Sequence, residues 1–334
     1  MNERPIIAVT LGDPAGIGPE ICLRLLREEA LLKHCVPVVF GSAAILRRVA
    51  GHTGLAFDAP ILPEDGAGGR LRVEVPSVLD LPLPEADQIV PGRVDPRCGE
   101  AAYQAVIATI DAGLAGRIDA VATAPLNKEA MHAAGHLYPG HTEIFAERMG
   151  AERSCMMLTS EELTCSFVTV HVGYHEVPDL LSIDRILEVI ELTATAMRRI
   201  RGREPKLLIC GLNPHAGEHG LFGRREEERL VEPAVAAARA RGISIEGPLP
   251  PDTVFLPWRR RAYDAVVCLY HDQGHIPLKA LAFDSAINTT LGLPVVRTSV
   301  DHGTAFDIAW QGRANPNSLY EAVKLAARLS RKED

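Results

Sequence analysis

The sequence has 334 residues, of which 47% are hydrophobic and 23% are charged, and its formal net charge is −8 at pH 7. This length exceeds what one hydrophobic core usually serves and indicates two lobes or domains. The composition is typical of a soluble globular protein, and the negative charge argues against a nucleic-acid partner, which needs a basic stripe. No apolar run approaches the length that spans a membrane.

Seven cysteines, an odd number without C-x-x-C spacing, are spread along the chain. Most of them lie inside apolar segments, so we interpret them as buried thiols in a reducing compartment. The amino terminus lacks the basic start and apolar stretch of a secretory signal. These features predict a cytoplasmic protein.

The first predicted strand, residues 6–11, opens into a glycine-rich loop, Gly12–Glu20, that precedes a helical pattern at 21–32. Gly16 and Gly18 lack the third glycine of the G-x-G-x-x-G dinucleotide fingerprint. Any NAD site is therefore expected to lack an ordinary Rossmann half.

The rest of the chain alternates predicted strands and helices, which favours an α/β fold with a largely parallel sheet. Residues 57–97, rich in Pro, Gly and Asp, read as an irregular excursion with strand-like pieces such as 71–75. The other expected strands are 36–40, 120–123, 166–170, 206–211, 265–270 and 293–297, and the other expected helices are 43–48, 99–115, 143–148, 183–200, 224–241 and 318–329.

Three of these strands each present a histidine just past the end of the strand. These residues are His171 after 166–170, His215 after 206–211, and His271 after 265–270. A single such histidine is most often a cap or a core residue. Three at equivalent positions favour a metal site, because imidazole is the commonest nitrogen ligand and three ligands leave a position for substrate.

Two other segments place polar groups at turns. His141 and Thr142 stand at a helix start, where a hydroxyl and free amides can bind an anion, although an ordinary helix cap explains the spacing equally well. Asp252 lies in a proline-stiffened loop, which suits a catalytic base, while an Asp beside Pro is most often a turn residue.

Several motifs, in this order, resemble the 4-hydroxythreonine-4-phosphate dehydrogenase family from about residue 6 to the end. They are Gly12-Asp-Pro-Ala-Gly-Ile-Gly-Pro-Glu20, Gly140-His-Thr-Glu143, Cys210-Gly-Leu-Asn-Pro-His-Ala-Gly-Glu218, Gly247-Pro-Leu-Pro-Pro-Asp-Thr253, Tyr270-His-Asp-Gln-Gly274 and Arg297-Thr-Ser-Val-Asp-His-Gly-Thr304.

The resemblance implies the fold of the isocitrate and isopropylmalate dehydrogenases, with two α/β lobes around a central cleft. The first lobe would comprise residues 1–125 and 285–334 and carry the nucleotide-binding loop. The second, 126–284, would carry the metal ligands and a homodimer interface. The implied NAD or NADP site is the loop containing Gly303, Thr304, Ala305, Asp307 and Ile308.

Carried over residue by residue, the resemblance implies that His171, His215 and His271 bind one divalent cation (Zn, Mg, Mn, Co or Ni). It places His141, Thr142, Lys279, Asn288 and Arg297 at substrate-binding positions, and Asp252 near the reacting carbon. It also implies a homodimer with a shared metal site, in which His171 and His215 come from one chain and His271 from the other.

The implied reaction is an NAD(P)-dependent oxidation, with decarboxylation, of a 4-phosphorylated four-carbon 3-hydroxy acid. Asp252, Lys279 and His141 are the candidate catalytic residues, and the base is either Asp252 or Lys279. Segments such as 124–130 and 305–310 look more like the branch that oxidises D-threonate or D-erythronate 4-phosphate than the vitamin B6 branch, so the 2-substituent stays open. The rival classes are a metal-dependent hydrolase, for which the same residues would activate water, and a non-catalytic phosphosugar-binding protein.

Overall fold

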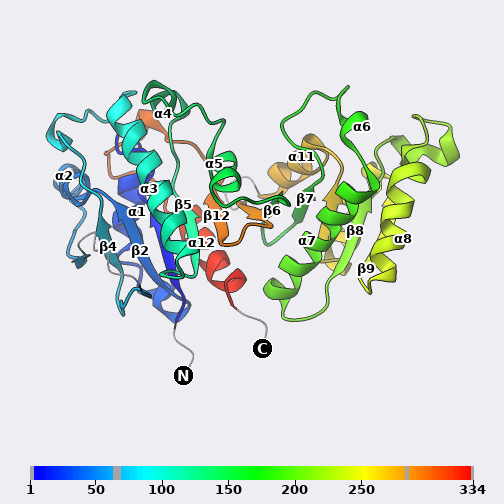
Figure 1. Cartoon of the computed structure of the whole chain (residues 1–334), viewed down its shortest axis with the longest axis horizontal. Helices are drawn as coiled ribbons and strands as arrows, with labels where there is room; N and C mark the ends of the chain where they lie inside the picture. The colour runs from blue at the N-terminus through cyan, green and yellow to red at the C-terminus, as the bar shows by residue number, and fades with distance from the viewer. Residues whose placement is uncertain (1–3, 63–68, 283–285, 332–334) are drawn as a thin grey trace. The chain divides into compact units, whose positions relative to one another are not determined.

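The computed structural model describes residues 4–62, 69–282 and 286–331, and these divide into two compact units. Unit 1 runs to Glu152 and resumes at Leu293, whereas unit 2 spans Arg153–Gly292 (Figure 1). The chain therefore leaves unit 1 once and returns to it. Of the two predicted boundaries, the one between 284 and 285 touches residues outside the described ranges.

Unit 1 is built on a parallel sheet with the strand order β3-β4-β2-β1-β5-β12. Its strands are β1 (Ile6–Thr10), β2 (Val36–Gly41), β3 (Ile61–Leu62), β4 (Ser77–Asp80), β5 (Ala120–Thr123) and β12 (Val296–Val300). Its helices are α1 (Gly18–Leu25), α2 (Ala43–Thr53), α3 (Pro96–Leu114), α4 (Lys128–Ala133), α5 (His141–Arg148) and α12 (Asn317–Leu329), with short turns η1 (Glu29–Lys33), η2 (Ala86–Gln88) and η5 (Phe306–Ile308). The parallel pairing confirms the predicted α/β class.

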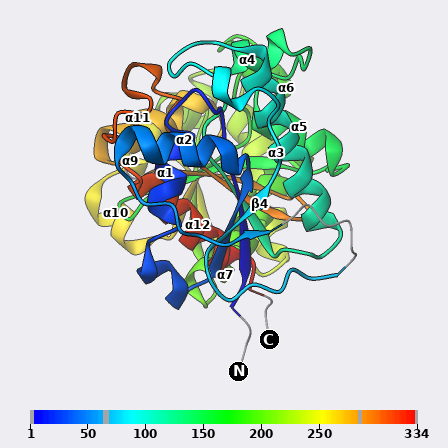
Figure 2. The ribbon, with the colours of Figure 1, turned by 90° about the vertical axis from the view of Figure 1, so that its left-hand side faces the viewer.

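Helices cover both faces of the unit 1 sheet, as a parallel sheet requires. Helix α3 packs on β1, β2 and β5, and α12 packs on β12, β5 and β1. Figure 2 shows α1 and α12 on one side of these strands and α3 on the other. Helix α3 starts where the sequence provides a cap, because Asp95 Oδ1 accepts a hydrogen bond from the Arg97 amide at 2.8 Å and Pro96 fixes the first turn.

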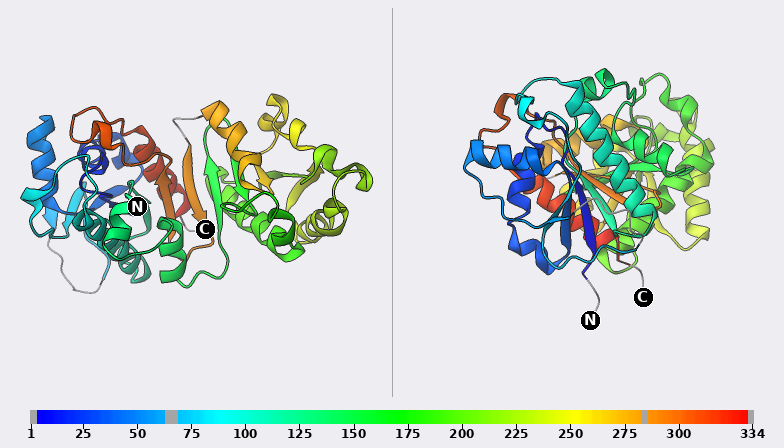
Figure 3. Two further views of the ribbon diagram at one scale, coloured as in Figure 1. Left: turned by 90° about the horizontal axis from the view of Figure 1, so that it is seen from above. Right: turned by 60° about the vertical axis from the view of Figure 1, so that its left-hand side comes forward.

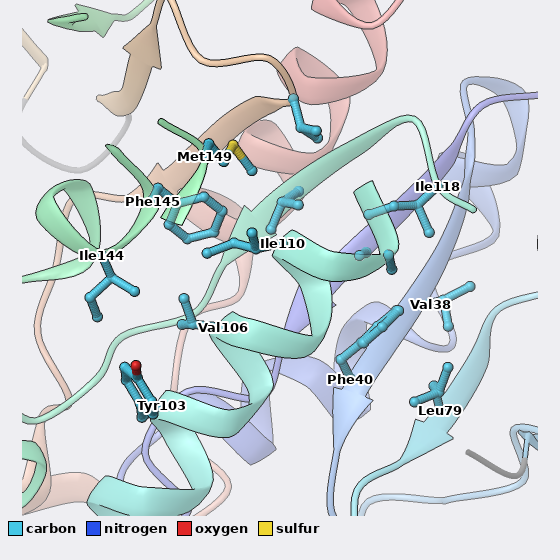
Figure 4. Close-up of a cluster of buried hydrophobic side chains, with 14 of the residues drawn as sticks. Val38, Phe40, Leu79, Tyr103, Val106, Ile110, Ile118, Ile144, Phe145 and Met149 are labelled. Carbon is cyan, nitrogen blue, oxygen red and sulfur yellow. The ribbon is translucent and has the colours of Figure 1, made fainter. Parts of the chain in front are cut away.

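Helices α4 and α5 belong to unit 1, although the predicted boundary after residue 125 assigned them to the second lobe. The reason is packing. Helix α5 contributes Ile144 and Phe145 to a buried hydrophobic cluster, and Met149, its C-cap, lies in the same cluster. Tyr103 and Ile110 of α3 belong to this cluster too (Figure 4). The unit boundary therefore falls between Glu152 and Arg153, and His141 and Thr142 lie in unit 1.

Unit 2 is built on a mixed sheet with the strand order β11-β6-β7-β10-β8-β9. The strands β7, β10, β8 and β9 pair in parallel, whereas β6 runs antiparallel to both β7 and β11. The strands are β6 (Cys155–Thr159), β7 (Thr164–Phe167), β8 (Lys206–Cys210), β9 (Ser244–Leu249), β10 (Ala265–Cys268) and β11 (Ile287–Leu291). The helical segments are α6 (Val177–Leu180), α7 (Ile183–Arg201), η3 (Pro214–Gly220), η4 (Glu227–Val231), α8 (Glu232–Ala240), α9 (Pro251–Val254), α10 (Pro257–Ala262) and α11 (His271–Ala282).

The unit 2 sheet is also covered on both faces. Helix α7 packs on β7 and β10 and contacts α8, while α11 packs on the same two strands. The left panel of Figure 3 shows α7, in green, on one side of this sheet and α11, in yellow-orange, on the other. Helix α8 also packs on β9, so α7 and α8 together cover one face of this sheet.

Two predicted elements of unit 1 differ from the structure. The predicted helix at 21–32 ends at Leu25, because Glu28 accepts a hydrogen bond from the Ala30 amide at 3.2 Å and starts the separate turn η1. The predicted strand at 71–75 is not a strand in the described chain. Leu71 and Val73 instead pack against the core of unit 1, which explains their alternating pattern.

Two predicted elements of unit 2 also differ. The segment predicted as one helix from 224 to 241 begins as the π-helical turn η4 and continues as α8. The proline-rich segment that was read as a loop around Asp252 is instead the end of β9 followed by the short helix α9. Proline is compatible with both, because Pro251 occupies the first turn of α9.

The seven cysteines are buried free thiols, as the sequence predicted. Within the described ranges, the helices are all too short or too polar to cross a membrane.

Candidate active site

The three strands that precede the candidate metal ligands are neighbours in the unit 2 sheet. They lie in the order β7-β10-β8 and run parallel, so their carboxyl ends share one edge of the sheet. His171 follows β7, His271 begins α11 directly after β10, and His215 lies in η3 after β8. Each of the three histidines therefore follows a strand that ends at this edge, three to five residues beyond the end of that strand.

His171 and His271 lie close together, with ring centroids 5.6 Å apart. Both line a cavity of about 270 Å³, together with Tyr174 and Asp272. Asp272 Oδ1 lies 2.6 Å from Nδ1 of His271, and Tyr174 donates its hydroxyl to the other oxygen of this carboxylate. Since Asp272 holds the Nδ1 proton, Nε2 of His271 keeps its lone pair, and this is the usual arrangement behind a metal-binding imidazole.

A fourth histidine, His275, supports this pair from inside the protein. It is buried and stacks on His271 with ring centroids 3.6 Å apart and an interplanar angle of 8°. Its Nδ1 donates to the His271 carbonyl at 2.9 Å. Burial lowers the pKa of His275 to about 4, so the ring is neutral at pH 7 and buttresses His271 without adding charge.

His215 lies apart from this pair. It is exposed, its Nδ1 is 3.2 Å from Glu218 Oε2, and it lines a separate cavity of about 440 Å³ with His219 and Glu228. Within the described residues of one chain, no three His, Cys, Asp or Glu side chains are close enough to hold a metal. The structure thus brings two of the three predicted ligands together and leaves the third outside their cavity.

In unit 1, His141 and Thr142 at the start of α5 lie beside the buried Arg297 of β12 and form a cationic cluster with it. Arg297 is 2% exposed, and its guanidinium donates to Thr142 Oγ1 at 3.4 Å and to Thr123 Oγ1 at 2.8 Å. Its Cζ also lies 5.6 Å from the centre of the Phe145 ring. Burial lowers the pKa of Arg297 to about 10, because a low-dielectric environment disfavours the charged form. The guanidinium is still charged at pH 7, and an anionic ligand would stabilise that buried charge.

His141 has an unpaired ring nitrogen in this cluster. Its Nε2 is buried and finds no hydrogen-bond partner among the described residues. Burial, followed by the charges of Arg297 and Lys128, holds the pKa of His141 well below its usual value, so the ring is neutral. Lys128 was not predicted as a site residue, although its place in a segment between a strand end and His141 could have suggested it.

The remaining predicted substrate and catalytic residues lie in unit 2. Lys279 is exposed on α11, and Asp252 is exposed on α9. Asn288 lies on β11, and its Oδ1 is buried with no hydrogen-bond partner among the residues that the structure describes. A buried amide oxygen without a donor is a position at which a ligand could bind.

The loop implied as the nucleotide site is fixed to the glycine-rich loop of unit 1. Thr304 accepts a hydrogen bond from the Ile17 amide at 3.0 Å through its carbonyl, and a Cβ added to Gly16 would lie 3.0 Å from Thr304. Trp310 Nε1 donates to the Pro14 carbonyl at 3.0 Å. Two motifs almost 300 residues apart therefore form one structure, and Gly16 permits their close approach.

Two buried carboxylates of the glycine-rich loop, Glu20 and Asp13, were not among the predicted site residues. Glu20 is fully buried and accepts hydrogen bonds from the amides of Gly312 at 3.0 Å and Ala314 at 2.7 Å. Asp13 is also buried, with Oδ1 accepting from the Ala15 amide at 2.8 Å. Its Oδ2 has no partner among the described residues, and burial raises the pKa of Asp13 to about 7. Their position inside a family motif was the available signal.

Comparison with known proteins identifies relatives of the whole chain. The family described as "Pyridoxal phosphate biosynthetic protein PdxA" matches residues 33–326. A D-threonate 4-phosphate dehydrogenase of Pectobacterium atrosepticum is 43% identical over 97% of this chain and 99% of its own. A 4-hydroxythreonine-4-phosphate dehydrogenase of Geobacter metallireducens is 44% identical over 99% and 97%.

The solved structures agree with these relatives. A crystal structure of 4-hydroxythreonine-4-phosphate dehydrogenase from Klebsiella pneumoniae superposes with a TM-score of 0.84 at 44% identity, covering 98% of this chain and 100% of that one. The likeness extends over both units and over every motif that the sequence shares with the family. The chain belongs to the PdxA family.

Proposed function

We propose that this chain catalyses the NAD(P)- and divalent-metal-dependent oxidation, with decarboxylation, of a 4-phosphorylated four-carbon 3-hydroxy acid. The observation that carries the proposal is the cluster of His141, Thr142 and Arg297, in which a buried cation and an unpaired ring nitrogen suit an anionic group. The relatives reported above are named as dehydrogenases of such substrates. Their names give no support to the hydrolase alternative.

In this reaction the cluster of His141, Thr142 and Arg297 binds one anionic group of the substrate. Arg297 neutralises its charge, Thr142 contributes a hydroxyl, and neutral His141 donates from Nε2. Lys128 adds positive charge beside His141. The net charge of the chain is −8, which disfavours binding of an anionic substrate. The positive charge of this cluster offsets that repulsion locally.

The metal would be held by His171, His215 and His271, with Asp272 orienting His271. When bound, a divalent cation makes the substrate hydroxyl more acidic, and NAD or NADP accepts the hydride. Asp252 or Lys279 takes the hydroxyl proton as the hydride leaves, which gives a β-keto acid. The bond to its carboxylate then breaks, CO₂ leaves, and the electron pair of that bond forms an enolate that takes up a proton. Lys279 and Asn288 also offer a charge and a buried amide oxygen to the substrate.

The proposal includes a homodimer that completes the metal site, with His171 and His215 from one chain and His271 from its partner. Its support is that one chain brings together no set of three metal ligands within its described part. His171 and His271 of the same chain are neighbours, however, so the alternative division, with His215 supplied by the partner, is tested beside it. The seven buried thiols favour a reducing compartment, and we place the enzyme in the cytoplasm.

One assay tests the proposed function. The purified protein, supplied in turn with Zn²⁺, Mg²⁺, Mn²⁺, Co²⁺ or Ni²⁺, is given NAD or NADP and each of three substrates: 4-hydroxythreonine 4-phosphate, D-threonate 4-phosphate and D-erythronate 4-phosphate. Formation of NAD(P)H with release of CO₂ from at least one of them is expected. Turnover of none of them, or product formation without nucleotide, would contradict the proposal.

A further inference from the structure

The segment that carries His215 has an unusual backbone. Six consecutive residues have positive φ angles: 53° at His215, 53° at Ala216, 81° at Gly217, 43° at Glu218, 57° at His219 and 87° at Gly220. For residues other than glycine this left-handed region is unfavourable, and it is normally visited by single residues, not by runs. Such a conformation persists only where its surroundings fix it, and these cases cluster at functional sites.

A buried carboxylate lies inside this turn. Glu227 is 1% exposed, and its Oε1 accepts hydrogen bonds from the amides of Leu212 at 2.9 Å and Asn213 at 2.8 Å. Its Oε2 accepts from Asn213 Nδ2 at 3.1 Å. A Cβ added to Gly217 would lie 2.5 Å from Oε2, so the left-handed turn wraps directly around this side chain.

The neighbouring Glu226 holds the other end of the same segment. It is 5% exposed, and its Oε2 accepts from the Arg224 amide at 2.7 Å and from Asn213 Nδ2 at 3.0 Å. Asn213 therefore links both carboxylates. The π-helical turn η4, Glu227–Val231, begins at Glu227 with Glu226 as its N-cap, and π-helical turns occur frequently at functional sites.

We infer that Glu227 is a positioning residue that fixes the His215 turn so that the imidazole can bind metal. The inference rests on the proposed function, in which His215 is a ligand. Burying a carboxylate is costly unless hydrogen bonds compensate for it. Within the described chain, the hydrogen bonds of the Glu227 side chain all go to residues 212 and 213, just before His215. The Glu227 carboxylate is therefore hydrogen-bonded to this turn and, among the described residues, to no other part of unit 2.

The test uses the Glu227→Gln protein with Co²⁺ as the probe. Glutamine has the same size and can still accept from one backbone amide, but its amide group meets Nδ2 of Asn213, donor against donor. The expected result is Co²⁺ binding weakened by at least about tenfold, as for other groups that support metal ligands. Calorimetry and the visible absorption of bound Co²⁺ report this directly, and excess Co²⁺ should restore kcat.

A second measurement reports the turn itself without metal. Arg224 and Arg225 are exposed at its end, and trypsin should cleave there faster in the metal-free Glu227→Gln protein than in wild type. The matched control is Glu232→Gln, which neutralises an exposed carboxylate lining the same cavity and should change neither readout. If Glu227→Gln does not fold, Asn213→Ala, which removes the shared donor, should show the same two effects.

The outcomes separate this inference from the proposed function. Wild-type Co²⁺ affinity and cleavage in the Glu227→Gln protein, with binding lost in His215→Ala, would overturn the positioning role and leave the ligand assignment intact. Unchanged Co²⁺ binding in His215→Ala would overturn the assignment of His215, and the positioning role with it.

Discussion

Asp272 Oδ1 lies 2.6 Å from Nδ1 of His271, on the residue next to it in the chain. This contact assigns the tautomer of the imidazole, because a carboxylate can only accept the proton that Nδ1 carries. Asp272, which orients the candidate ligand His271, thus lies in the same first turn of α11 as His271 itself. It also gives the first test of the metal site.

Replacing Asp272 by Asn should weaken metal binding by about 10 to 100-fold, since the loss of a carboxylate behind a ligating histidine typically has this effect. Metal content and binding enthalpy measure it. Tyr174→Phe is the control, because it removes only the hydroxyl that donates to Asp272. The contact between Asp272 and His271 stays in place. An Asp272→Asn protein with wild-type metal affinity would show that His271 is not oriented in this way.

Mixing inactive variants should reveal how two chains share the metal ligands. If His171 and His215 come from one chain and His271 from its partner, unfolding and refolding His171→Ala with His271→Ala should restore about a quarter of wild-type activity by random pairing. A mixture of His171→Ala with His215→Ala should then stay inactive. The reverse pattern would mean that His171 and His271 act from the same chain, as their 5.6 Å ring separation permits.

Recovery in neither mixture, with subunit exchange confirmed by mass spectrometry, would contradict a shared site. The measurement also requires that each single variant is folded and dimeric. Circular dichroism and sedimentation of the separate proteins provide that control.

The buried Asp13 should make stability depend on pH. Its pKa is raised from 3.8 to about 7 by burial, so between these values the unfolded chain releases a proton that the folded protein keeps. The contribution of Asp13 to the free energy of unfolding therefore falls as pH rises from about 4 to about 7, and it stays constant above pH 7. The shift corresponds to roughly 4 kcal/mol.

Asp13→Asn should remove this dependence and keep the acceptor for the Ala15 amide. Relative to wild type, the variant should gain stability as pH rises from 4 to 8, measured by urea unfolding across that range. Asp111→Asn, at an exposed aspartate of α3, should show no such gain. Parallel pH profiles for wild type and Asp13→Asn would disprove the raised pKa.

Trp310→Phe should weaken nucleotide binding without affecting the metal. The substitution removes the indole donor to the Pro14 carbonyl, which connects the loop of residues 303–308 to the glycine-rich loop. We expect the KM for NAD or NADP to rise about 5 to 10-fold, consistent with the loss of one buried hydrogen bond. Unchanged KM for nucleotide, or an equal rise for the phosphorylated substrate, would mean that the loop does not serve the nucleotide.

The sequence by itself determined the fold class and the edge of the sheet at which to look. Short apolar runs such as 120–123 and 265–270, which alternate with helical patterns, are typical of buried parallel strands, and neighbouring parallel strands end on one edge of a sheet. This is why His171, His215 and His271 could be predicted to follow neighbouring strand ends. The long helices were also predictable from their amphipathic pattern, although α3 begins at Pro96, three residues before the predicted start at residue 99.

Only the tertiary structure decided which of these residues meet. The boundary after Glu152 depends on α5 packing against α3, which no local pattern encodes. The left-handed turn at His215 depends on Glu227, whose role as a buried acceptor follows from contacts made in the folded chain. Charge, burial and backbone strain are properties of a neighbourhood, and the neighbours of Arg297, Asp13 and Glu20 lie between 2 and 294 residues away along the chain.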